Sequence, residues 1–106
     1  MPRSFREAPV AENPPSLQLQ FDEQTSQGHY ANLAMLSATD SEFILDFVFV
    51  PPHTLKAKVG SRVILSPSHA KRLAQMLVEN INRYEAVYGP IRMPVPPPPV
   101  APGNAH

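Results

Sequence analysis

The chain has 106 residues, no cysteine and equal numbers of acidic and basic side chains, so its formal net charge is zero. That length leaves room for one domain at most. The lack of cysteine excludes disulfides and thiolate metal sites, and zero net charge argues against a protein that coats nucleic acid by bulk electrostatics. No apolar run approaches the roughly 20 residues that cross a bilayer, and the N-terminus lacks the shape of a signal peptide, so we expect a cytoplasmic protein.

Prolines divide the chain into a central domain and two ends. Ten of the 14 prolines fall before Ser16 or after Ile91. We therefore expect a disordered N-terminal arm over residues 1–15, a single folded domain over 16–91 and a disordered proline-rich tail over 92–106. A domain of 76 residues is close to the lower limit of stability, which makes oligomerisation an attractive source of further buried area.

The proline-rich tail has two interpretations. Its segment from Pro94 to Pro102 favours polyproline II, a preformed ligand for the aromatic grooves of other proteins. The same composition is also typical of a plain spacer, and the spacer is the simpler interpretation.

Hydrophobic patterning predicts a series of strands. Leu17, Leu19 and Phe21 alternate with polar residues, which is the period of a half-buried strand. The strongest strand pattern is that of residues 43–50, which are apolar on both faces and interrupted only by Asp46. In residues 55–65 apolar and polar side chains keep one alternation through Gly60, which predicts one long strand. The predicted strands are residues 17–22, 30–37, 43–50 and 55–65.

A long helix follows the last strand. Ser66 and Pro67 are typical of a helix start, because a capping hydroxyl precedes a proline at the first helical position. The helix is predicted to run to about Tyr88, and Gly89 with Pro90 ends it. Its apolar arc spans roughly 200°, well beyond the ~100° that suffices for a helix on the surface of a single domain. That excess indicates a second partner for the helix.

The predicted fold is α+β: an antiparallel β-meander of about four strands followed by one long C-terminal helix. We expect the helix to pack on one face of the sheet and to meet its own copy across a two-fold axis, giving a homodimer. Asn80 lies within the apolar arc, where its amide either fixes the register of two helices or reaches a backbone group at the sheet edge. The candidate dimer interface comprises Leu73, Met76, Leu77, Asn80, Ile81, Tyr84 and Val87.

Several short motifs follow one another along the predicted domain: YANL at 30–33, EFILDF at 42–47, KAKV at 56–59, RVILSP at 62–67, HAKRL at 69–73, ENI at 79–81, YE at 84–85 and GPI at 89–91. In this order they resemble a widespread prokaryotic family, the domain of unknown function 3467. The resemblance implies a short prokaryotic cytosolic protein and carries no established activity, substrate or cofactor. It covers nearly the whole predicted domain and leaves the proline-rich tail outside.

Residues that typically carry catalysis are scattered. The histidines at positions 29, 53, 69 and 106 show no helical i, i+4 pair, so a metal site of the HExxH kind is absent from the sequence. The four glycines form no phosphate-binding loop. We therefore expect no catalytic residue, no cofactor and no metal. The enzymatic alternative is a site across the dimer, in a deep pocket lined by Asp46 or His69.

Two charged positions allow a functional and a structural interpretation. His69 and Arg72 lie one turn apart near the helix start, where they either hold an anion or, more simply, His69 helps to cap the helix. Asp46, in an apolar strand, requires a partner, for which Lys58, Arg62 or Arg72 is suitable. A structural ion pair is the favoured interpretation of Asp46.

The hairpin between the last two strands suggests a nucleic-acid surface. If Val50 pairs with Leu55, aromatic residues of one strand oppose basic residues of the next, as stacking on bases and contact with phosphates require. The strand order also looks like that of the PC4-type transcriptional coactivator, by fold-level analogy alone. Alternatively, the phenylalanines are core beneath the helix. The candidate nucleic-acid face comprises Phe43, Phe47, Phe49, Lys56, Lys58 and Arg62.

The leading functional hypothesis is thus a non-enzymatic homodimeric module for protein interaction or assembly, with an unknown protein partner. The alternative is a single-stranded nucleic-acid-binding protein that uses the aromatic and basic sheet face.

Overall fold

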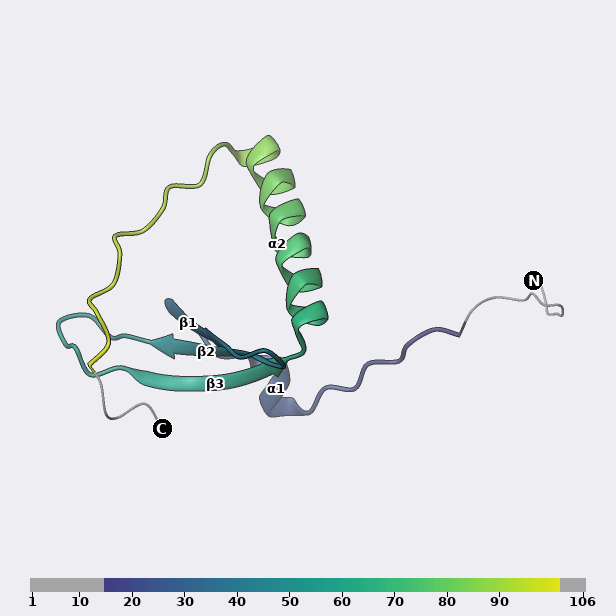
Figure 1. Cartoon of the computed structure of the whole chain (residues 1–106). Coiled ribbons are helices and arrows are strands. Elements are labelled where there is room, and N and C mark those ends of the chain that lie inside the picture. Colours follow the sequence, from purple (N-terminus) through teal and green to yellow (C-terminus); the bar gives the residue numbers. More distant parts are fainter. Residues whose placement is uncertain (1–14, 102–106) are drawn as a thin grey trace, which may run out of the picture.

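The computed structural model describes residues 15–101, which form an α+β domain. A three-stranded antiparallel sheet, with the second strand in the middle, is followed by one long helix that leaves the end of the third strand and rises away from the sheet (Figure 1). The predicted order of an antiparallel sheet followed by a long C-terminal helix is confirmed. The elements are α1 (Glu23–Gln27), β1 (Leu33–Ala38), β2 (Phe43–Phe49), β3 (Lys58–Leu65) and α2 (Pro67–Tyr88).

The two predicted disordered ends are described only in part. Residues 1–14 and 102–106 lie outside the described residues. The described part of the tail, residues 92–101, contains neither helix nor strand.

The predicted count of four strands is wrong, because residues 17–22 form no strand. They run as an extended segment away from the sheet (Figure 1). Alternating side chains determine which faces a strand would have, but a strand forms only where a neighbouring backbone pairs with it. The segment ends at Asp22, whose carboxylate accepts a hydrogen bond of 2.6 Å from the backbone N–H of Thr25 and caps α1. Gly28 ends this short helix at a φ of 76°, a conformation that glycine adopts readily.

β1 and β2 form a regular hairpin. Their pairing runs from Leu33 opposite Val48 to Ala38 opposite Phe43. The Thr39 hydroxyl accepts hydrogen bonds from the backbone N–H groups of the turn residues that precede β2, at 3.2 and 3.1 Å. A short polar segment thus joins the two strands tightly, as its composition predicts.

β2 and β3 pair in a register that differs from the predicted one. Val50 does not pair with Leu55, because β3 begins only at Lys58, which lies opposite Phe49. The register shifts between Phe47 and Val48, whose partners are Ser61 and Val59, so Gly60 is an additional residue in β3. This β-bulge reverses the side-chain alternation of β3. The prediction that one alternation continues through Gly60 is therefore wrong.

The sheet has two different faces. One, here called the helix face, turns toward α2 and carries Leu36, Phe43, Leu45, Phe47, Val63 and Leu65. The other, here called the open face, carries Leu33, Met35, Ile44, Asp46, Val48, Arg62 and Ile64.

The core of the described chain is small. Within residues 15–101, Val48 in the middle strand is the one buried apolar residue, with 3% of its surface exposed. Side chains on the helix face, such as Leu45 and Phe47, are only half-buried. A single copy of this chain therefore leaves most of its apolar surface in contact with solvent.

α2 has the predicted bounds. The Ser66 hydroxyl accepts a hydrogen bond of 3.3 Å from the backbone N–H of His69, and Pro67 occupies the first helical position. Gly89 ends the helix at a φ of 93°, and its N–H donates to the Glu85 carbonyl. These local signals act without the rest of the fold, which explains why the helix is predicted correctly from sequence.

Candidate functional site

The first turns of α2 and the sheet line two open grooves, one toward β1 and one toward β3. Leu45 on β2 and Leu73 on α2 line both grooves. Beyond the grooves the helix rises away from the sheet (Figure 1). The helix face and the apolar side of α2 together form the candidate interaction surface.

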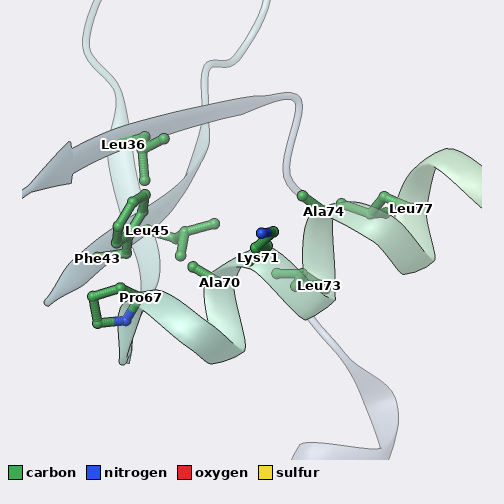
Figure 2. Close-up of a pocket in the computed structure, with 9 residues that line it drawn as sticks. All are labelled: Leu36, Phe43, Leu45, Pro67, Ala70, Lys71, Leu73, Ala74 and Leu77. Carbon is green, nitrogen blue, oxygen red and sulfur yellow. The ribbon is translucent and has the colours of Figure 1, made fainter.

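The groove on the β1 side is almost entirely apolar and encloses about 280 Å³. Figure 2 shows Leu36, Phe43 and Leu45 on the strands across from the small and branched side chains of the helix. Lys71 contributes the one charged side chain of its lining. Such a groove is suited to apolar side chains from another chain segment.

The groove on the β3 side combines apolar and basic side chains. Its strand residues are Leu45, Phe47, Val63 and Leu65. The helix contributes His69, Arg72, Leu73 and Met76. His69 also lies with its ring Nδ1 3.1 Å from the Ser66 hydroxyl, in addition to its backbone hydrogen bond to that oxygen. These contacts support the capping interpretation of His69 over the anion site.

The remainder of α2 exposes a long apolar surface. No residue of the helix is buried. Tyr84 and Tyr88 lie against each other with ring centroids 4.8 Å apart, and both remain more than half exposed. The exposed apolar residues of the helix are Met76, Leu77, Val78, Ile81, Tyr84, Val87 and Tyr88. An apolar surface of this kind is unusual on a monomer, so this side of α2 is a candidate interaction surface.

The predicted dimer-interface residues differ in their surroundings. Leu73 is half-buried against its own sheet, while Met76, Leu77, Ile81, Tyr84 and Val87 are exposed. The Asn80 amide donates to the Met76 carbonyl at 2.8 Å and its oxygen accepts from Arg83 at 3.1 Å. Asn80 therefore binds within its own helix and does not reach the sheet edge.

The candidate nucleic-acid face is not one surface. Phe43 and Phe47 lie on the helix face, opposite Leu65 and Ser61 and not opposite basic residues. Arg62 lies on the open face, where it pairs with Asp46. The predicted aromatic and basic pairs are thus wrong, because the Gly60 bulge and the later start of β3 change the register.

A smaller aromatic and basic cluster remains at the end of the hairpin. Phe49 lies opposite Lys58, and Tyr30 packs edge-to-face on Phe49 with ring centroids 5.9 Å apart. His29, Val59 and Gly60 complete the lining of a shallow pocket beside these rings. Lys56 precedes β3 and takes no part in this lining.

Asp46 forms the structural ion pair that its position in an apolar strand indicates. Its partner is Arg62, one of the three predicted candidates, at 2.7 Å from Nε to Oδ1 and 2.9 Å from Nη2 to Oδ2. The hydrogen bonds from Arg62 lower the pKa of Asp46 below its ordinary value. None of the three grooves and pockets described above is lined by Asp46.

One structural residue lies outside the sequence-based candidates. The Asn32 side chain accepts a hydrogen bond from the Val50 N–H at 2.8 Å and donates one to the Val50 carbonyl at 2.9 Å. The amide thus imitates a strand backbone and extends the pairing of β1 with β2 by one position. An asparagine directly before an apolar strand is the only local signal, and it is a weak one.

Comparison with known proteins assigns the chain to a family. The family model described as "Protein of unknown function (DUF3467)" matches residues 4–93. The chain belongs to this family. For DUF3467, the match spans the sheet, α2 and the extended segment before them, and ends in the proline-rich tail. No curated protein and no solved structure gives a significant match. In the described range 15–101, no helix combines the length and apolarity needed to cross a membrane.

Proposed function

We propose that this DUF3467 protein is a non-enzymatic cytoplasmic module that forms a homodimer through α2 and offers the assembled dimer to a protein partner. The observation that carries the proposal is the exposure of α2: none of its residues is buried, although its apolar side chains continue from the groove to the last turn. Apolar area of this extent is removed from water only by another chain.

The expected strength of self-association follows from the same side chains. Burying a half-exposed apolar side chain contributes about 1 kcal/mol. Both copies contribute, so the gross gain over the exposed residues of α2 is on the order of 10 kcal/mol, against an association cost of about 4–15 kcal/mol. Added burial in the two grooves moves the balance toward binding. The gain and the cost are thus of similar size, so we expect an equilibrium between monomer and dimer that depends on protein concentration.

Two substitutions in the same turn of α2 test the proposal. Ile81 lies on the exposed apolar surface and Asn82 on the polar side. Ile81→Glu introduces a charge into the proposed interface, whereas Asn82→Glu introduces the same charge outside it. Light scattering across micromolar concentrations is expected to show a dimer for the wild type and Asn82→Glu, and a monomer for Ile81→Glu.

Circular dichroism on the same samples separates dissociation from unfolding. A folded wild-type chain that stays monomeric at about 100 µM, so that its dissociation constant lies well above about 100 µM, contradicts the proposal. So does an Ile81→Glu variant that dimerises as tightly as Asn82→Glu.

Single-stranded nucleic-acid binding is the second candidate function, on a reduced surface. The observation in its favour is the cluster of Tyr30, Phe49 and Lys58, which brings two aromatic rings beside a basic residue. Gel retardation of a labelled oligonucleotide at low salt, lost in the Lys56→Glu, Lys58→Glu double variant, would support it. Absence of retardation at low salt rejects this candidate without affecting the dimer.

A further inference from the structure

We infer that the extended arm of one copy, residues 16–22, completes the sheet of a second copy by adding a strand to its β1 edge. The inference rests on the proposed self-association and specifies its geometry: the dimer is joined by exchanged arms as well as by α2. Four observations carry it, concerning the arm, the edge, the groove beside that edge and the direction in which the arm leaves its own sheet.

The arm has the pattern of a strand but no strand partner. Leu17, Leu19 and Phe21 alternate with Gln18 and Gln20, so that one face of an extended segment is apolar and the other polar. The three apolar residues are 91%, 76% and 65% exposed. A segment with this alternation requires an open sheet edge with an apolar surface beside it.

β1 offers such an edge. The strand pairs with β2 on one side only, so its other side presents unpaired N–H and C=O groups. Its sequence, LAMLSA, carries no charge that would oppose pairing. The opposite edge, β3, carries Lys58 and Arg62 and is distorted by the bulge at Gly60. Charges and bulges protect a sheet edge from pairing with another strand, so the β1 edge is available for pairing and the β3 edge is protected.

The apolar groove on the β1 side lies where the arm would need it. Leu36 on β1 lines this groove and is itself 63% exposed. A strand added to β1 lies about 4.8 Å beyond it, and its side chains alternate between the two faces of the sheet. The leucines and phenylalanine of the arm would then cover Leu36 and the groove that Figure 2 shows, while the glutamines turn to the open face.

The segment that connects β1 to the arm starts from the β3 side of the sheet. The segment before β1 crosses the end of the hairpin: Tyr30 packs on Phe49, Asn32 binds Val50, and the Cβ of His29 lies near Gly60 of β3. α1, capped by Asp22, then leads into the arm, which runs away from its own sheet (Figure 1). An arm with this direction meets the β1 edge of another copy in place of its own.

Disulfide trapping between two differently tagged full-length copies tests the inference, and the native chain has no cysteine to interfere. One copy carries Gln18→Cys or Gln20→Cys, and the other carries Ser37→Cys on β1 or Ile64→Cys on β3. Ser37 and Ile64 both lie opposite Ile44 and on the same face of the sheet. They differ only in their strand, so a crosslink to Ser37→Cys reports the β1 edge and a crosslink to Ile64→Cys reports the β3 edge. A disulfide forms only where the two Cα atoms come within about 7 Å.

A crosslink between tagged copies through Ser37→Cys, and none through Ile64→Cys, is the expected result. A second measurement uses Leu17→Ser with Leu19→Ser, which should weaken dimerisation about tenfold or more, whereas Gln18→Ser with Gln20→Ser should leave it unchanged. A wild-type chain that is monomeric overturns the proposed function itself. If the wild type is a dimer but the variants crosslink through Ile64→Cys or not at all, the arm exchange alone is overturned.

Discussion

Asp46 and Arg62 face each other across β2 and β3 and are joined by two parallel hydrogen bonds of 2.7 and 2.9 Å. Asp46 is 7% exposed, in the middle strand, and the guanidinium satisfies both of its oxygens. The pair lowers the pKa of the Asp46 carboxyl and raises the pKa of the Arg62 guanidinium. One ionic contact thus makes a charged residue compatible with an otherwise apolar strand.

The first prediction concerns acid stability. Because the folded-state pKa of Asp46 lies below its ordinary value of 3.8, the ion pair stabilises the fold fully above that value. Its contribution is lost as the pH falls below 3.8 through the lowered pKa. The free energy of unfolding should therefore decrease on acidification below about pH 4, measured by denaturant titration at fixed protein concentration.

Asp46→Asn is the matched variant for this pH dependence. It removes the titrating group and keeps the shape of the side chain, so its stability should fall less steeply in acid. Some dependence should remain, because the hydrogen bonds from Thr25 also lower the pKa of Asp22. An Asp46→Asn profile that is parallel to the wild-type profile would exclude the ion pair as a source of acid sensitivity.

The second prediction concerns the start of α2. Ser66→Ala removes the oxygen that accepts from the His69 N–H, and should lower the free energy of unfolding by about 1 kcal/mol. Ser66→Asp, which retains a capping oxygen, should recover most of the loss. Thermal and urea unfolding of the two variants provide the measurement, and equal losses in both would contradict the cap.

The third prediction compares two glycines with different backbones. Gly89 has a φ of 93° and a ψ of 172°, a conformation essentially restricted to glycine, so an alanine there is strained and should destabilise the fold by about 1–3 kcal/mol. A Cβ at Gly60 would meet only ordinary contacts, 3.7 Å from the Phe47 carbonyl oxygen, and Gly60→Ala should be neutral or slightly stabilising. Urea unfolding of both variants decides the point; a large loss in Gly60→Ala would argue against the observed bulge.

The fourth prediction concerns the extension of the β1–β2 pairing. Asn32→Ala removes both hydrogen bonds to Val50 and should cost roughly 1–2 kcal/mol. Asn82→Ala, on the polar side of α2, serves as a control and should change stability by less than about 0.5 kcal/mol. Hydrogen exchange should also show faster exchange of the Val50 N–H in the Asn32 variant, and an unchanged rate would contradict the assigned contact.

Sequence alone determined those elements whose causes are local. The bounds of α2 follow from Ser66 and Pro67 at one end and Gly89 at the other, since caps and backbone preferences act within a few residues. β2 was recognisable because its side chains are apolar on both faces. The need of Asp46 for a cationic partner was also evident, although three candidates remained.

The tertiary structure decided what depends on a partner strand. Gly60 carries no side-chain signal that distinguishes a bulge from a regular strand position, yet the bulge and the later start of β3 together place Arg62 opposite Asp46 and not opposite Phe43. The arm at residues 16–22 has the alternation of a strand, but no neighbouring backbone pairs with it in the described part of the chain. Alternation is a property of one segment and register is a property of two, so only the folded chain specifies which side chains meet.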